Sequence, residues 1–397
     1  MPLRIAALDH DPAASGCADR PRASSAAPTA LFATALATLL AACATDEPVP
    51  VRSAMTHAEA RALIVQALPP GVGERAGWAA DIHAALTALQ VPVNASNVCA
   101  AVAITEQESS FRANPTVPGL AAIAWREIDA KSERAGVPPA VARTALKLPS
   151  SNGRSFAERI DAATTEKELS EIFDDFVGMV PMGRRLFAGA NPVRTGGPMQ
   201  VAIAFAEQHA AARPYPYPVA TDLRAEVFTR RGGLYFGIAH LLDYPADYDR
   251  PLYRFADFNA GHYASRNAAF QNAVSIASGI ALDLDGDLVL RGPDAGRRTG
   301  ATEAALRSLA PRLGLDQDAI RAALAQEKEA RFARSAVYRK VFEAAEQAHG
   351  RPLPRAVVPR IQLKSPKITR QLTTEWFATR VDERHRRCVV RVNAQGA

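Results

Sequence analysis

A single carboxylate on an otherwise apolar helix stripe is the feature of this sequence best suited to chemistry. Ala101, Ile104, Glu108 and Phe111 are spaced at i, i+3, i+7 and i+10, which places them on one face of a helix. Burying an ionised carboxylate without a partner is costly, so such a group stays protonated, finds a partner or lines a cleft. A carboxyl group on an apolar wall can act as a general acid near neutral pH. The spacing alone does not separate a catalytic Glu108 from a solvated glutamate at a helix end.

The other acidic residues near this stripe, or in patterns of their own, are expected to be structural. Glu106 lies about 200° around the same helix and is expected in solvent. Asp257 is expected on the surface of a helix end, with a second catalytic carboxylate as the alternative. Asp283, Asp285 and Asp287 alternate with leucines around an Asp-Gly pair, which predicts a β-hairpin. They do not match an EF-hand, because their glycine stands fourth rather than sixth.

Sequence signatures of other chemistries are missing. The chain has no His-Glu-x-x-His pattern, no Gly-x-Ser-x-Gly elbow, no phosphate loop and no dinucleotide fingerprint. Neither a metal nor a cofactor is therefore expected. The histidines are scattered and are expected at surfaces or helix caps, with His262 beside Gly261 as the one nearest to a motif.

Two further short segments follow Glu108-Ser109-Ser110-Phe111 along the chain. They are Gly197-Pro198-Met199-Gln200 and Phe258-Asn259-Ala260-Gly261, the latter preceded by an apolar segment at residues 233–242. In this order they resemble motifs of the soluble-type lytic murein transglycosylases. Those motifs are Glu-Ser-x-Phe at a helix end, Gly-x-Met-Gln under the sugar cleft, and Tyr-Asn-Ala-Gly between two helices. The layout of the whole chain also resembles an uncharacterised family of bacterial lipoproteins.

The resemblance implies a lysozyme-like helical enzyme that cleaves peptidoglycan glycan strands. Glu108 would protonate the oxygen between N-acetylmuramic acid and N-acetylglucosamine, and would then take the proton of the muramyl 6-hydroxyl. A 1,6-anhydro end would result, and no water would be consumed. By the same resemblance Ser109 would hydrogen-bond the muramyl side, Met199 and Gln200 would line the cleft, and Asn259 would orient the substrate.

Two departures from the family pattern keep other functions open. Residues 112–196 far exceed the usual gap between the first two motifs, which predicts an inserted subdomain. Phe258 replaces the motif tyrosine and removes a hydroxyl group, which Tyr235, Tyr253 or Tyr263 could replace. The alternatives are a murein-binding lipoprotein that keeps the cleft without activity, a lysozyme-type hydrolase, and a structural lipoprotein unrelated to glycans.

The N-terminal segment predicts a lipid anchor. Residues 31–42 are apolar except for two threonines, too short to span a bilayer, and end in Leu40-Ala41-Ala42-Cys43. This resembles a bacterial lipobox, so residues 1–42 are expected to be a signal peptide and residues 43–55 a tether. Cys43 would carry acyl chains such as palmitate. Because Ala44 rather than an aspartate follows, the expected location is the outer membrane, facing the periplasm.

The net charge and the cysteines also bear on the compartment. The net charge is +6, and a basic cytoplasmic chain would suggest nucleic acid, but the expected export argues against that partner. In an oxidising compartment Cys99 and Cys388 could form a disulfide, with two buried thiols as the alternative. A basic run near the C-terminus is expected to be a solvated face, or else to meet acidic murein peptides or anionic head groups. It consists of Arg380, Arg384, Arg386, Arg387 and Arg391.

The fold expected around these residues is mainly α. Residues 56–278 would form the lysozyme-like catalytic core with its insertion at 112–196, and residues 279–397 would form a helical C-terminal extension. A capping box at Thr56 and Glu59 opens the first predicted helix. Further helices are predicted over residues 74–90, 96–110, 137–146, 165–178, 198–212, 222–230, 233–243, 250–258, 263–277 and, in pieces, 302–349. The last forty residues, rich in proline and arginine, are expected to be extended.

Overall fold

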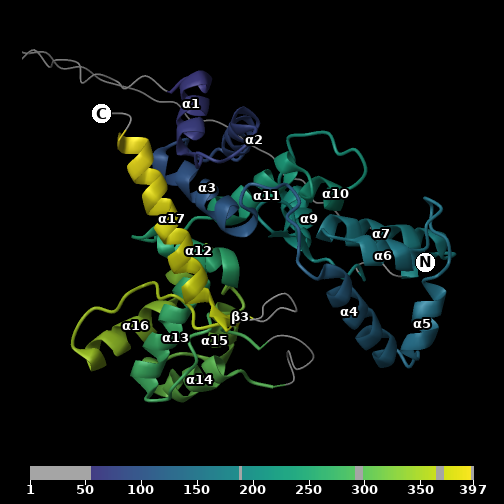
Figure 1. The fold of residues 1–397 in the computed structure, drawn as a ribbon. Coiled ribbons are helices and arrows are strands. Elements are labelled where there is room, and N and C mark those ends of the chain that lie inside the picture. The colour runs from purple at the N-terminus through teal and green to yellow at the C-terminus, as the bar shows by residue number, and fades with distance from the viewer. Residues whose placement is uncertain (1–54, 187–189, 291–297, 364–370, 395–397) are drawn as a thin grey trace, which may run out of the picture. The chain divides into compact units, whose positions relative to one another are not determined.

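The computed structural model describes residues 55–186, 190–290, 298–363 and 371–394. The expected signal peptide, Cys43 and nearly all of the expected tether lie outside these ranges. The described part is mainly helical (Figure 1), which confirms the predicted fold class. Within it, no helix combines the length and the apolar character needed to cross a bilayer.

The first three helices form the centre of the main hydrophobic core. They are α1 (His57–Ala67), α2 (Arg75–Ala88) and α3 (Ala95–Ser109). The predicted capping box opens α1, because Thr56 and Glu59 bond each other's backbone N–H groups. Along α3 every residue from Val98 to Thr105 is buried, so this helix is surrounded by other elements. These elements are mainly α1, α11 (Arg230–Leu242) and α17 (Thr374–Ala394).

The C-terminal segment is a helix that completes this core, so the expectation of an extended tail was wrong. Helix α17, yellow in Figure 1, packs along α3 and along α12 (Pro251–Ala260). Phe377, Val381, Cys388 and Val392 are buried and follow one another at i, i+4, i+11 and i+15. This is a helical stripe. The arginines between these residues lowered the apparent apolar character of the segment and obscured the stripe.

Residues 112–196, expected to be an insertion, contain a small hydrophobic cluster of their own. It contains α4 (Leu120–Arg134), α5 (Pro139–Ala145), α6 (Phe156–Ala162), α7 (Glu166–Met179) and α8 (Gly183–Leu186). Phe156, Ile160, Ala163 and Ile172 form its buried cluster. The two helices predicted at 137–146 and 165–178 correspond to α5 and α7.

A further hydrophobic core gathers the helices from α13 to α16. They are α13 (Ala264–Ser278), α14 (Ala301–Leu313), α15 (Gln317–Leu324), the 3₁₀ helix η2 (Ala330–Arg334) and α16 (Ala336–His349). Phe270 of α13 lies among Phe332, Tyr338 and Phe342. Because α13 packs on α14 and α16, this core begins before residue 278, where the extension was expected to start.

The hairpin predicted around Asp285 and Gly286 does not form. Residues 282–290 contain no strand, and their backbone is bonded to side chains of α13 instead. Gln271 Oε1 accepts from the N–H of Gly286 at 2.8 Å, and Asn267 Nδ2 donates to the Gly286 carbonyl at 3.1 Å. Gln271 Nε2 also donates to the Asp285 carboxylate at 2.7 Å. The alternating leucines therefore pack against a helix, and side-chain amides satisfy the backbone groups that a partner strand would have satisfied.

The described strands form two short antiparallel pairs. Strand β1 (Thr195–Gly196) pairs with β2 (Val201–Ala202), and β3 (Gln362–Leu363) pairs with β4 (Leu372–Thr373). The first pair is followed by α9 (Ile203–Ala212), and α10 (Leu223–Val227) precedes α11. The helix predicted to begin at Pro198 therefore begins at Ile203, because residues 197–200 form the turn of the β1–β2 hairpin.

Candidate functional site

Glu108 stands in the last turn of the buried helix α3. Its stripe neighbours Ala101 and Ile104 have no exposed surface, whereas Glu108 itself is half-buried. The helix ends at once after it, because Ser110 and Phe111 both adopt left-handed backbone conformations, with φ of 50° and 60°. Two such non-glycine residues in succession are uncommon and strained. The ring of Phe111 packs edge-on against Trp78 of α2, with centroids 5.2 Å apart, which holds this abrupt end in place.

Glu106 and Ser109, the neighbours of Glu108, have structural partners. Glu106 was expected to be solvated, but its carboxylate lies 3.5 Å from Nε of Arg384 on α17. Ser109 was expected to hydrogen-bond substrate, but it is buried. Its hydroxyl donates to the Thr105 carbonyl at 3.0 Å and accepts from the N–H of Arg112 at 3.3 Å. Ser109 therefore closes the helix end and does not present a hydroxyl to a sugar, which corrects its expected role.

The hairpin turn at residues 197–200 is fixed to α11 by Met199. This side chain is fully buried, and a Cβ added to Gly237 of α11 would lie only 2.5 Å from its sulfur. Met199 therefore packs against the bare backbone of α11 and has no exposed surface with which to line a cleft, contrary to expectation. Gln200 is half-buried with a φ of 50°, and its Nε2 donates to the Gly197 carbonyl at 3.1 Å.

Asn259 lies exposed in the last turn of α12. Its side-chain oxygen accepts a hydrogen bond of 3.0 Å from the hydroxyl of Thr374, the first residue of α17. The preceding residue, Phe258, accepts at its carbonyl from Nε2 of His240 on α11 at 3.2 Å. Helix α12 ends at Gly261, whose φ of 105° favours glycine. The Asn259 side chain is thus oriented by α17 and its backbone by α11.

Asp257 is completely buried, so the prediction of a surface aspartate was wrong. Its carboxylate accepts from the hydroxyls of Tyr244 at 3.1 Å and Tyr248 at 2.6 Å. It also accepts from the backbone N–H groups of Tyr263 at 3.0 Å and Ser265 at 2.7 Å. Burial raises the pKa of Asp257, and these hydrogen bonds oppose the rise. The group joins α12 to the start of α13.

A stack of aromatic rings lies beside this carboxylate. His262 is sandwiched between His240, at 4.6 Å between ring centroids, and Tyr244, at 4.1 Å. Burial lowers the pKa of His240 to about 3 and also lowers that of His262, so both rings are neutral near pH 7. They were expected at surfaces or caps. Their partners lie 18 to 22 residues away along the chain, which is why local pattern did not reveal them.

Helix α11 brings the three motif-bearing elements together. It packs against α3, which carries Glu108, against β2 beside Gln200, and against α12, which carries Asn259. Two cavities in the described part lie elsewhere, one of about 410 Å³ beside Asp243 and one of about 660 Å³ beside Tyr248. Among the described residues, no group of three or more His, Cys, Asp or Glu side chains is placed to hold a metal ion.

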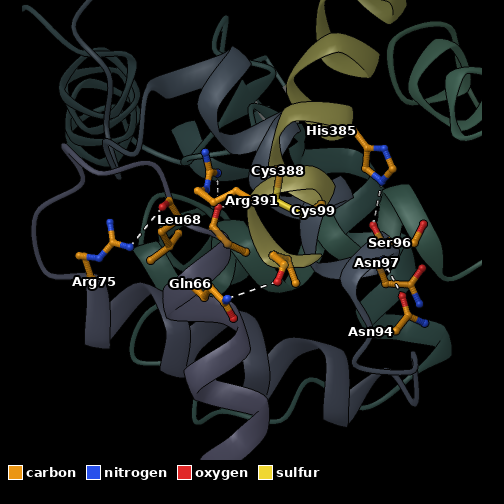
Figure 2. The surroundings of a disulfide bond; sticks show 12 residues. Gln66, Leu68, Arg75, Asn94, Ser96, Asn97, Cys99, His385, Cys388 and Arg391 are labelled. Atoms are coloured by element: carbon orange, nitrogen blue, oxygen red, sulfur yellow. Dashed lines mark hydrogen bonds between the residues drawn. A yellow bond between two sulfur atoms is a disulfide. The ribbon is translucent and has the colours of Figure 1, made fainter. Parts of the chain in front are cut away.

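A disulfide ties α17 to α3. Cys99 and Cys388 are bonded with their Cα atoms 5.5 Å apart, although 289 residues separate them in the chain (Figure 2). His385 donates to the Ser96 carbonyl at 3.1 Å on one side of the bond. On the other side Arg391 donates to the carbonyl of Ala67.

The basic run of α17 is not the uniformly solvated face that was expected. Arg391 donates to the carbonyl of Ala67 on α1. Arg384 pairs with Glu106, and only 18% of the Arg384 side chain is exposed. Arg386 pairs with Asp382 at 2.8 Å but remains largely exposed. Two of the five arginines thus help to fix α17 on α1 and α3.

Comparison with known proteins assigns the chain to a family. Residues 71–391 match the family described as Protein of unknown function (DUF1615), and the chain belongs to this family. It is 50% identical over 351 residues to Uncharacterized protein YaiW of Escherichia coli (strain K12), covering 88% of this chain and 95% of that protein. No solved structure matches. The range matched to the family includes α3, the hairpin turn, α12 and both cysteines of the disulfide.

Proposed function

We propose that this protein is a peptidoglycan lytic transglycosylase. It would cleave the bond between N-acetylmuramic acid and N-acetylglucosamine without water and leave a 1,6-anhydro sugar. The observation that carries the proposal is the packing of α11 against α3, β2 and α12, the elements that hold Glu108, Gln200 and Asn259. Segments far apart in sequence, each resembling one transglycosylase motif, thereby share one supporting helix.

The reaction needs one residue that first gives and then takes a proton. Glu108 protonates the glycosidic oxygen as the bond to C1 breaks, and the acetamido oxygen of the substrate stabilises the cationic C1. The Glu108 carboxylate then removes the proton of the muramyl 6-hydroxyl, whose oxygen bonds to C1. Most glycosidases use two carboxylates. An intramolecular acceptor makes the second dispensable, and Asp257 is too fully buried and hydrogen-bonded to supply it.

The contacts support two different roles for the residues of the motifs. Gln200 and Asn259 keep accessible surface and would contact the glycan, whereas Ser109 and Met199 would hold the backbone around Glu108. The asparagine side chain is preorganised by its bond to α17.

Binding of murein without cleavage is the second candidate, and Phe258 favours it. The hydroxyl groups of Tyr235 and Tyr263 donate to the carbonyls of Pro214 and Pro245, at 3.4 and 2.9 Å. Neither of these two hydroxyls is therefore available to replace the one that Phe258 lacks, and Tyr253 lines the cavity beside Tyr248. A chain with this change would bind glycan strands and cleave them slowly or not at all.

Location follows from the N-terminal segment. The lipobox-like Leu40-Ala41-Ala42-Cys43 supports acylation at Cys43 and anchoring in the outer membrane, facing the periplasm. The disulfide fits an oxidising compartment. Both support the proposal that the folded part of the chain lies next to murein.

The test compares two glutamates of the same helix. Purified sacculi are incubated with the wild type, Glu108→Gln and Glu106→Gln, and soluble products are measured by mass spectrometry. Loss of general acid–base catalysis should lower product release by Glu108→Gln about 100-fold or more. Glu106→Gln, which removes only an ion pair with Arg384, should stay within a few-fold of the wild type.

The products also separate the candidate activities. Anhydro ends are lighter than reducing ends by one water, so reducing ends would identify a hydrolase. Binding of sacculi by the wild type without any soluble product would identify the murein-binding alternative. Equal release by Glu108→Gln and the wild type would refute the assignment of Glu108.

A further inference from the structure

The cavity of about 660 Å³ has features of a second binding site. One wall is the loop between α11 and α12, at residues 245–249, and the other is formed by η2, the start of α16 and residues 354–356. Its volume lies within the range of small-molecule sites, roughly 300–1,000 Å³. Four tyrosines line it, namely Tyr248, Tyr253, Tyr263 and Tyr338.

A buried cation lines this cavity. Arg266 is only 5% exposed, and its guanidinium lies over the rings of Tyr263, at 4.2 Å, and Phe332, at 5.1 Å. Its hydrogen-bond acceptors in the described part of the chain are all neutral. They are the side-chain oxygen of Asn267 and the backbone carbonyls of Glu327 and Glu329.

The charge of Arg266 is therefore not compensated by a hydrogen-bonded carboxylate. Four of its five N–H groups are used in these bonds, which leaves one on Nη1. Burial lowers the pKa of Arg266, and the charge of Asp257 opposes the drop only in part. Burying a charge that is only partly compensated is costly, and an anion entering the cavity would reduce that cost. The residue thus favours a carboxylate or a similar anionic group as part of the ligand.

Two tyrosine hydroxyls could add hydrogen bonds to such a group. The hydroxyls of Tyr253 and Tyr338 make no hydrogen bond to any residue within the described ranges, and both side chains line the cavity. Burial raises the pKa of Tyr338 to about 12, although Arg266 and Arg355 oppose the rise. Its phenol therefore stays protonated at neutral pH and can donate to an anion.

The rim of the cavity carries opposite charges on its two walls. Arg334 and Arg355 are exposed on the C-terminal wall, and Asp247 and Asp249 are exposed on the loop wall. Arg355 also pairs with Glu346 at 2.9 Å. A ligand with a carboxylate at one end and an ammonium group at the other matches this distribution. A phosphate dianion matches it less well, because the two aspartates would repel it.

We propose that this cavity binds a short peptide, with the peptide carboxylate at Arg266 and its ammonium group facing Asp247 and Asp249. The tyrosine rings flank the chain between these two groups. Free peptides carry both groups at their termini, whereas a murein stem, amide-linked at its N-terminus, carries the carboxylate and supplies an ammonium only from a side-chain amine. The site does not include Glu108, so peptide binding can be tested independently of the proposed glycan cleavage.

Calorimetry on the full chain tests the proposal with trialanine as the probe. Trialanine with free termini should bind, the C-terminal amide should bind at least 10-fold more weakly, and the N-acetyl form at least 3-fold more weakly. Because Arg266 is buried and its replacement could unfold the protein, the variants are placed at the rim. Arg334→Gln should weaken trialanine binding several-fold, whereas Arg321→Gln, exposed on α15 and outside the cavity, should not.

Further titrations compare trialanine with a muropeptide and with inorganic phosphate, and they distinguish the possible sources of the ligand. A soluble muropeptide with an intact stem that binds more tightly than trialanine supports murein stems, and equal binding supports free peptides. The proposal is overturned if the amide binds as tightly as trialanine, if folded protein binds neither peptide at millimolar concentration, or if inorganic phosphate binds more tightly. Glu108→Gln should bind trialanine as the wild type does, so loss of cleavage and loss of this site remain distinguishable.

Discussion

Glu108 and Asp257 are both carboxylates near the ends of helices that pack on α17, yet they differ in burial. Asp257 is fully buried and accepts hydrogen bonds from two tyrosine hydroxyls and two backbone N–H groups. Glu108 is half-buried at the point where α3 ends in two left-handed residues. A fully buried carboxylate that is bonded by four donors stabilises the fold. A half-buried carboxylate keeps surface that a substrate can reach, which the proposed role of Glu108 requires.

The strongest test of this contrast replaces each carboxylate and measures unfolding. Asp257→Ala would leave two backbone N–H groups and two buried hydroxyls without an acceptor, at about 1–3 kcal/mol for each group left unsatisfied. We expect the free energy of unfolding in urea to fall by at least about 3 kcal/mol. Glu108→Gln should change it by less than about 1 kcal/mol while abolishing product release. Similar losses of stability for both variants would show that Glu108 and Asp257 do not differ in their contribution to the fold.

The disulfide affects both carboxylates, because it ties α17 to α3 and α17 packs on the helices that carry Glu108 and Asp257. The double variant Cys99→Ser/Cys388→Ser should lose about 2–4 kcal/mol of stability. It should also lose activity several-fold, since Thr374 of α17 would no longer hold the Asn259 side chain firmly. Dithiothreitol should lower the melting temperature of the wild type but not of the double variant. If dithiothreitol left the melting temperature of the wild type unchanged, the disulfide would not stabilise the packing of α17.

The pH dependence of stability should belong to the region of Asp257 and His240. The pKa of His240 is lowered to about 3 in the folded chain, against 6.5 for an unperturbed ring, so the unfolded chain binds the extra proton between these values. Stability should therefore fall as the pH drops below 6.5, by about 2 kcal/mol between pH 7 and pH 5.

One variant checks the origin of this acid sensitivity. His240→Gln should reduce the fall of the urea midpoint between pH 7 and pH 5. Asp257 works in the opposite direction, because a carboxylate with a raised pKa costs stability as the pH rises through that pKa. An unchanged slope in His240→Gln would place the sensitivity elsewhere.

Local pattern predicted the helices better than it predicted their burial. The capping box of α1, the apolar spacing of α2 and the range of α13 followed from sequence, because these signals lie within one or two turns of the helix. The depth of Asp257, the stack around His262 and the packing of α17 depend on partners brought together by folding. For Glu108 the residues predicted an apolar helix face, but the supporting contacts of α11 and α17 could not be inferred from sequence.

Met199 and Gln200 allow the finest test, because they are neighbours on one hairpin turn with different exposure. Met199→Leu conserves volume against Gly237, so we expect a loss below about 1.5 kcal/mol and activity within a few-fold of the wild type. Gln200→Ala removes a half-buried amide whose Nε2 donates to the Gly197 carbonyl in the turn, and should lower product release more than it lowers stability. Unfolding in urea and product release from sacculi are measured for both variants. If Met199→Leu instead lost activity at unchanged stability, the methionine would contact the glycan after all, and the turn would have to open when substrate binds.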